Sequence, residues 1–184
     1  MLLHTFADMY RFTNTNISFA APDDIGSLKR LLDSAYRGDA SRQGWTTEAD
    51  LIAGDTRTDE KSLEQVMHQP GSIFLKYTGE SGEIHGCVNL QQQGPKLYLG
   101  MFSVSPGLQG NGIGKKILQA SEEYACYGEC SSIYMSVISV RTELINWYQR
   151  HGYNDTGERK PFYEDGFTGR HLQLLEFMIL EKNL

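Results

Sequence analysis

The feature that most constrains the fold is a stretch at residues 97–124, in which four glycines join an apolar segment to a helical pattern. Its sequence is LYLGMFSVSPGLQGNGIGKKILQASEEY. Backbone N–H groups at the start of a helix have no intrahelical partners and lie at the positive end of the helix dipole, so they favour an anion such as a pyrophosphate. Glycine lets the backbone approach that anion closely. The stretch therefore predicts a strand, a phosphate-binding loop and a helix.

Composition predicts one ordinary globular domain. The 184 residues are 40% hydrophobic and 22% charged, which suffices for a core without metals or disulfides. The net charge is -6 and no run of Lys or Arg marks a nucleic-acid groove, so we expect no nucleic-acid partner. No segment reads as a signal peptide or as a membrane span of about 20 apolar residues, so we expect a soluble protein with no membrane partner.

The three cysteines, Cys87, Cys126 and Cys130, are an odd number without framework spacing. This predicts reduced thiols and a cytoplasmic location. Cys126 and Cys130 stand four residues apart, but no second pair of ligands follows, so we expect packing and no metal site.

Hydrophobic periodicity predicts an alternation of strands and helices along residues 17–184. The expected strands are at residues 17–21, 72–77, 84–91, 96–105, 133–137 and 172–180, with extended structure from residue 153, and the expected helices are at 25–35, 112–128 and 142–151. Residues 160–170 are expected to form a loop. Residues 1–16 form an N-terminal extension, for which a short helix and a loose arm both remain open.

The connection at residues 36–71 mixes glycines, charges and Trp45, with short helical patterns near residues 47–53 and 61–68. Binding residues often lie on loops held by a scaffold, so Tyr36 and Trp45 can line a substrate pocket. The alternative is that both rings cover the edge of the core.

The glycine loop does not fit two familiar phosphate-binding motifs. A P-loop needs Gly-Lys followed by Ser or Thr, whereas Lys116 follows Lys115 here. A dinucleotide fold has its glycines after the first strand, whereas this loop follows a meander of antiparallel strands.

Residues 104–114 instead read V-x-P-x-x-Q-G-x-G-I-G. This resembles the acetyl-CoA-binding motif of the GNAT superfamily of N-acetyltransferases, with Gln109, Gly112 and Gly114 at its fixed positions. The order of strands and helices is similar as well. The resemblance implies an α/β (α+β) single-domain GNAT fold over residues 17–184, with a mixed, mostly antiparallel sheet of about seven strands and helices on both faces.

The resemblance also implies where acetyl-CoA binds. The backbone of Phe102, Ser103 and Val104 is expected to bond the pantetheine arm where two strands splay apart. Amides of the loop are expected to hold the pyrophosphate, namely those of Gln109, Gly110, Asn111, Gly112, Ile113 and Gly114. Lys115 and Lys116 either approach a phosphate or are solvated. Arg141 stands where the family often has Asn, and it can pair with a phosphate or a substrate carboxylate, or lie on the surface.

A second segment, INWYQRHGY at residues 145–153, resembles the family pattern of a tyrosine followed by glycine and an aromatic residue. The resemblance implies that Tyr148 protonates the leaving thiolate, whereas the alternative is that it packs in the core. Tyr98 stands where some members carry a glutamate base. The base is therefore open among Glu48, Asp50, His85 and Tyr98.

These expectations define an N-acetyltransferase that moves an acetyl group from acetyl-CoA to a small-molecule amine by direct attack. Its acceptor pocket is expected to be lined by Tyr36, Arg42, Trp45 and Phe162. Alternatives are a protein acetyltransferase acting on lysine or an N-terminus, and an acyl-CoA-binding sensor without turnover. A homodimer is possible.

Overall fold

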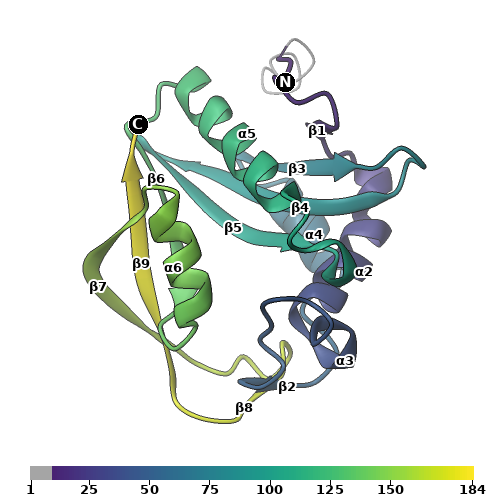
Figure 1. Cartoon of the computed structure of the whole chain (residues 1–184), viewed down its shortest axis with the longest axis vertical. Coiled ribbons are helices and arrows are strands. Elements are labelled where there is room, and N and C mark those ends of the chain that lie inside the picture. The colour runs from purple at the N-terminus through teal and green to yellow at the C-terminus, as the bar shows by residue number, and fades with distance from the viewer. Residues whose placement is uncertain (1–9) are drawn as a thin grey trace.

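The structure is a computed structural model that describes residues 10–184, and Figure 1 shows its single central sheet with helices on both sides. Residues 1–9 of the predicted extension lie outside the described residues. The described end of the extension packs on the long helix that follows the glycine loop, with the Tyr10 ring edge-on to Phe12 at 4.9 Å and to Tyr124 at 6.1 Å.

Seven strands form the sheet in the order β1-β3-β4-β5-β6-β9-β7. Their bounds are β1 (Ile17–Phe19), β3 (Ser72–Thr78), β4 (Ile84–Gln93), β5 (Lys96–Val104), β6 (Ser132–Ile138), β7 (Asn154–Phe162) and β9 (Leu175–Asn183). Every neighbouring pair is antiparallel except β5 and β6, which are parallel. The predicted mixed sheet is confirmed.

Helices cover both faces of this sheet, as the sequence predicts. On one face, α5 (Ile113–Tyr127) and α6 (Thr142–Arg150) bury their apolar sides in the larger core, in which Leu75, Leu97 and Ile117 are almost fully buried. On the other face, α2 (Ile25–Tyr36) and α4 (Glu60–Met67) enclose a second core around Phe74 and Cys87. Alternating strand residues thus feed two separate cores.

The prediction of a helix near residues 47–53 is wrong. Residues Ile52–Ala53 form the short strand β2, which pairs antiparallel with β8 (Arg170–His171). This contact joins segments more than a hundred residues apart, and such pairing overrides a short helical pattern. A short helix, α3 (Gly38–Ser41), precedes β2, and Figure 1 shows α3, β2 and β8 gathered at one end of the molecule.

The loop expected at residues 160–170 is shorter than predicted, because β7 continues to Phe162 and β8 begins at Arg170. The last strand also begins later than the expected residue 172. The other predicted strands and helices are confirmed to within a few residues at each end.

Candidate active site

The central strands separate partway along their length and leave a cavity. β5 and β6 are paired only from Lys96–Ser132 to Tyr98–Tyr134 and diverge beyond that point. A cavity of about 440 Å³ opens there, bounded by both strands, α6, the glycine loop and the end of α2. Seven consecutive residues of β5, 98–104, line it. Because strand side chains alternate between faces, this continuous lining means that the backbone edge of β5 itself faces the cavity.

A bulge in β5 shapes this edge. Cys87 pairs with Ser103 and Asn89 with Gly100, so Val88 stands opposite two residues of β5, one of which is Met101. Met101 has a φ of +48°, an uncommon value for a residue with a side chain. Bulges re-aim side chains and interrupt pairing, and they are enriched next to active sites.

The glycine loop lies at the mouth of the cavity and leads into α5. Gly110 and Gly112 have φ values of +86° and +79°, which other residues adopt only with strain. A side chain built at either glycine would meet no other atom, so the loop leaves open space in front of its backbone. Gly112 begins α5 without a side-chain cap, so the first N–H groups of the helix have no side-chain acceptor. The loop therefore has the form of an anion cradle.

The residues of the predicted motif do not all face the cavity. Gly110, Gly112, Gly114 and Lys115 line it. Asn111 is not among the lining residues, and the Ile113 side chain is buried in the larger core. The two lysines also separate, because the Lys116 ammonium lies 5.5 Å from the centre of the Tyr77 ring, away from the cavity.

Gln109 bridges the two sides of the cavity mouth. Its side-chain oxygen accepts hydrogen bonds from the backbone N–H of Trp45 at 2.9 Å and of Thr46 at 3.4 Å, and its amide nitrogen donates to the Val104 carbonyl at 3.2 Å. Gly44 is required for this contact, because a Cβ there would lie 2.5 Å from the Gln109 oxygen. The side chain of the motif glutamine thus holds the segment that carries Trp45.

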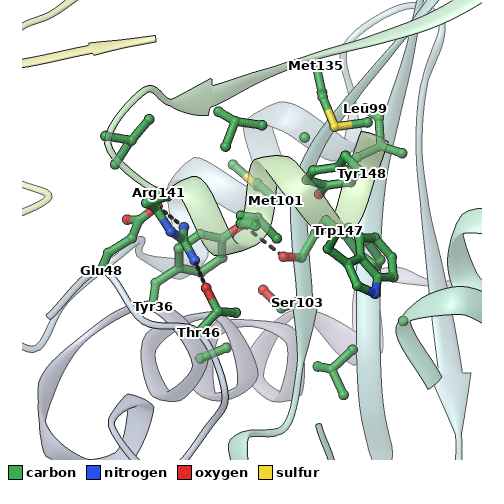
Figure 2. Close-up of a pocket in the computed structure, with 18 of the residues that line it drawn as sticks. Tyr36, Thr46, Glu48, Leu99, Met101, Ser103, Met135, Arg141, Trp147 and Tyr148 are labelled. Carbon is green, nitrogen blue, oxygen red and sulfur yellow. Dashed lines mark hydrogen bonds and ion pairs between the residues drawn. The ribbon is translucent and has the colours of Figure 1, made fainter. Parts of the chain in front are cut away.

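Tyr148 packs in the core and also faces the cavity. It is 4% exposed and packs edge-on against Trp147 at 5.1 Å and Tyr153 at 5.8 Å. It also lines the cavity, and Figure 2 shows its hydroxyl pointing inward between the β5 and β6 sides. Burial raises the pKa of the Tyr148 hydroxyl well above its ordinary value, so the group stays protonated at neutral pH.

Arg141 is buried and does not lie on the surface. It donates to a Glu48 carboxylate oxygen at 2.9 Å and to the Thr46 hydroxyl at 2.6 Å, as Figure 2 shows. The other Glu48 oxygen accepts from Arg37 at 2.6 Å. Glu143 lies 3.7 Å from the Arg141 Nε atom. Two guanidinium groups occupy both oxygens of Glu48, so this carboxylate is poorly suited to abstract a proton.

The other base candidates lie differently. Asp50 is exposed and forms an ion pair with Arg42. His85 is on β4 and is not among the lining residues of the cavity. Tyr98 lines the cavity at the point where β5 and β6 part, with its ring 5.2 Å from that of Tyr134.

Of the expected acceptor residues, Tyr36, Trp45 and Phe162 line the cavity, whereas Arg42 does not. Arg42 instead holds Asp50 and the Ala49 carbonyl on the outside of the connection. Its ion-pair partner Asp50 stands eight residues away, and no pattern in the sequence marks this pairing. The Tyr36 hydroxyl donates to the Phe102 carbonyl at 2.9 Å, which ties the end of α2 to β5.

The sequence analysis does not single out several further lining residues, which include Arg57, Met101, Trp147, His151 and Phe177. Trp147 and His151 lie in the segment that contains Tyr148, one helical turn apart, and their rings are 4.2 Å apart. Helical spacing could have indicated His151, three residues after Tyr148, and then Trp147, four residues before His151. Arg57 stands in a polar segment without periodicity, which gave no signal.

The mixed sheet splits between two parallel strands, and a glycine loop and a buried tyrosine lie at the split. This arrangement defines the class of protein as acetyltransferase-like. The profile of the acetyltransferase (GNAT) domain matches residues 41–175. The match covers well over half of the chain, so this protein belongs to the GNAT acetyltransferase family.

Curated relatives match a shorter stretch. An uncharacterised protein of Bacillus subtilis (strain 168), YdhI, is 32% identical over 74 residues, which are 40% of this chain and 45% of that protein. The spermine/spermidine N(1)-acetyltransferase of the same organism is 34% identical over 64 residues, 34% of this chain and 42% of the relative. The chain thus spans less than half the length of these relatives.

Solved structures match over nearly the full fold. A GNAT-family acetyltransferase of Staphylococcus aureus superposes with a TM-score of 0.66 at 18% identity, covering 92% of this chain and 98% of the other. The ribosomal-protein-S18-alanine N-acetyltransferase of Escherichia coli gives 0.67 at 14% identity, covering 91% and 92%. A GNAT acetyltransferase of Elizabethkingia anophelis with acetyl-CoA bound gives 0.56 at 17% identity, covering 68% and 84%. At these identities the likeness concerns the fold.

Residues 10–184 contain neither a membrane-spanning helix nor a cluster of metal-binding side chains. No helix in this part of the chain is long and apolar enough to cross a membrane. Within the same residues, no group of three or more His, Cys, Asp or Glu side chains is arranged to hold a metal ion.

Proposed function

We propose that this protein transfers an acetyl group from acetyl-CoA to the nitrogen of a small-molecule amine, with Tyr148 as the general acid. The observation that carries the proposal is that Tyr148 and the glycine loop line one cavity, beside a strand edge that has lost its neighbour. The family membership and the acetyl-CoA-bound structural neighbour support the donor.

The residues around the cavity fit acetyl-CoA. The buried Ser103 hydroxyl has no hydrogen-bond partner among the described residues, as expected for a group that meets a ligand. Amides of residues 110–114 are suited to the pyrophosphate, with Lys115 beside them, and the edge of β5 at residues 102–104 is suited to the pantetheine arm. When bound, acetyl-CoA supplies a thioester carbonyl that an amine can attack.

In this proposal the amine nitrogen forms a bond to the acetyl carbon as the carbon–sulfur bond breaks. Tyr148 donates its proton to the departing sulfur, a role for which a hydroxyl within hydrogen-bond reach is required. A tyrosine hydroxyl is protonated at neutral pH, and burial raises the Tyr148 pKa further. A departing thiolate is also more basic in desolvated surroundings than in water, which favours its protonation.

The amine must also lose a proton. Glu48 is held by two arginines, so we assign this step to water positioned by Tyr98, the remaining base candidate that lines the cavity. Backbone N–H groups along the bulged edge of β5 are suited to stabilise negative charge on the acetyl oxygen, since preorganised donors of this kind supply several kcal/mol in other enzymes.

A thiol-release assay with acetyl-CoA and a panel of amines, amino acids and peptides tests the proposal. Tyr148→Phe should lower kcat by about 100-fold or more, the usual contribution of a positioned acid. Tyr153→Phe is the matched control, because Tyr153 is equally buried in the same core but its hydroxyl points to Glu122, 3.3 Å away. Turnover of peptides alone would favour a protein acetyltransferase. Binding of acetyl-CoA without any turnover would favour a sensor.

A further inference from the structure

The cavity carries a cation that the protein itself does not neutralise. Arg57 lies in the connection between β2 and α4 and lines the cavity beside Tyr36. Its guanidinium carbon is 5.2 Å from the centre of the Tyr36 ring, a cation–π distance. Its backbone N–H donates to an Asp33 carboxylate oxygen at 2.6 Å, which fixes this part of the connection to α2. Arg57 is thus held at two points, and its charged group is held at the cavity wall.

The other charges on this side of the cavity balance one another. Arg37 and Arg141 share Glu48, and Glu143 lies 3.7 Å from Arg141. No carboxylate among residues 10–184 forms an ion pair with Arg57. The acceptor side therefore has one excess positive charge. A guanidinium presents a planar fork of donors that matches a carboxylate in two parallel hydrogen bonds.

We infer that Arg57 binds a carboxylate of the acceptor, so that the acceptor is a small amine that also carries an acid group, such as a free amino acid. The inference rests on the proposed acetyl transfer and adds the substrate class. Tyr36 positions the guanidinium, and the aromatic lining from Trp45 and Phe162 contacts the uncharged part of the acceptor. A polyamine brings several positive charges to a site that already has one in excess, so polyamines are poor acceptors for this chain.

The test compares acceptors that differ only in the carboxylate, such as tyrosine with tyramine and tryptophan with tryptamine, with spermidine as the polycation. The amino acid of each pair should have the higher kcat/KM. Arg57→Gln should lower kcat/KM for the amino acids by about 10- to 100-fold, the range for a hydrogen bond to a charged group. The values for the decarboxylated amines and the KM of acetyl-CoA should stay unchanged. Arg57→Lys should restore part of the loss, because it keeps the charge without the planar fork.

Arg30→Gln is the matched control, since Arg30 is an exposed arginine of α2 whose side chain donates to Ser27. A preference for spermidine or for the decarboxylated amines, or an equal loss with every acceptor in Arg57→Gln, would overturn the inference while leaving acetyl transfer in place. A binding measurement separates the two claims. If no amine is turned over, the proposed function fails, and the inference then stands only if amino acids raise the melting temperature of the CoA complex in the unmodified protein and not in Arg57→Gln.

Discussion

Replacing Glu48 with glutamine should destabilise the protein strongly. Glu48 is 7% exposed, and its two oxygens accept from Arg37, which is 2% exposed, and from Arg141, which is 7% exposed. The substitution keeps the shape but removes the negative charge, which leaves buried Arg37 without a counterion and buried Arg141 with only the exposed Glu143. Removing one partner of a buried ion pair costs about 3–5 kcal/mol. For a domain of this length each kcal/mol lowers Tm by about 2–4 °C, so we expect a decrease of roughly 6–20 °C.

Scanning calorimetry and urea unfolding of Glu48→Gln measure this decrease. Asp50→Asn is the matched control, because Asp50 is close in sequence but exposed, and an exposed ion pair contributes about 0–1 kcal/mol. If Glu48→Gln keeps the Tm of the unmodified protein and loses only activity, Glu48 is not a stabilising counterion of the two arginines. That result would identify Glu48 as the base.

Three further predictions concern the cavity mouth and the second core. Gln109→Ala should raise the KM of the acceptor with little change in the KM of acetyl-CoA in steady-state kinetics, because it frees the segment that carries Trp45; equal changes in both would contradict this. Gly44→Ala should lower the free energy of unfolding in urea by about 1 kcal/mol. The loss should be smaller in a Gln109→Ala background, where the new Cβ no longer meets the glutamine, and equal losses in the two backgrounds would exclude the contact. Burial raises the pKa of the Cys87 thiol from 9.0 to about 12, so its contribution to the free energy of unfolding is complete below pH 9 and is lost as pH rises toward 12. In Cys87→Ala the free energy of unfolding should fall less steeply over this range, by about 1.4 kcal/mol per pH unit. Parallel curves for the two proteins would refute this.

Local patterns predicted most of the fold because the long elements carry their own signal. The helix expected at residues 112–128 is found as α5, since its apolar stripe and its flanking glycines act within a few turns. The segment at residues 47–53 shows the limit. Glu48 forms ion pairs with Arg37 and Arg141. Ile52 pairs with His171 between strands β2 and β8. Such distant partners leave no periodic trace in the sequence.

The residues of the candidate site could be predicted where a sequence motif determines the backbone conformation. They could not be predicted where a side chain's position depends on ion pairs formed in the folded protein. The glycine spacing and the position of Tyr148 led to residues that share one cavity. The bulge at Met101 follows Gly100, an isolated glycine in a strand pattern that could have indicated a bulge but not which residue takes the positive φ. Arg42 and Arg57 both stand in the polar connection at residues 36–71, yet only Arg57 lines the cavity. Their roles depend on which carboxylates fold nearby.

The most direct test of the central claim is the electron density of acetyl-CoA in cocrystals of this protein. We expect the pyrophosphate to lie against the amides of residues 110–114, the pantetheine arm to follow the edge of β5, and the sulfur to lie within hydrogen-bond reach of the Tyr148 hydroxyl. Density for the donor outside this cavity, or with its sulfur on the side of β5 away from Tyr148, would contradict the account.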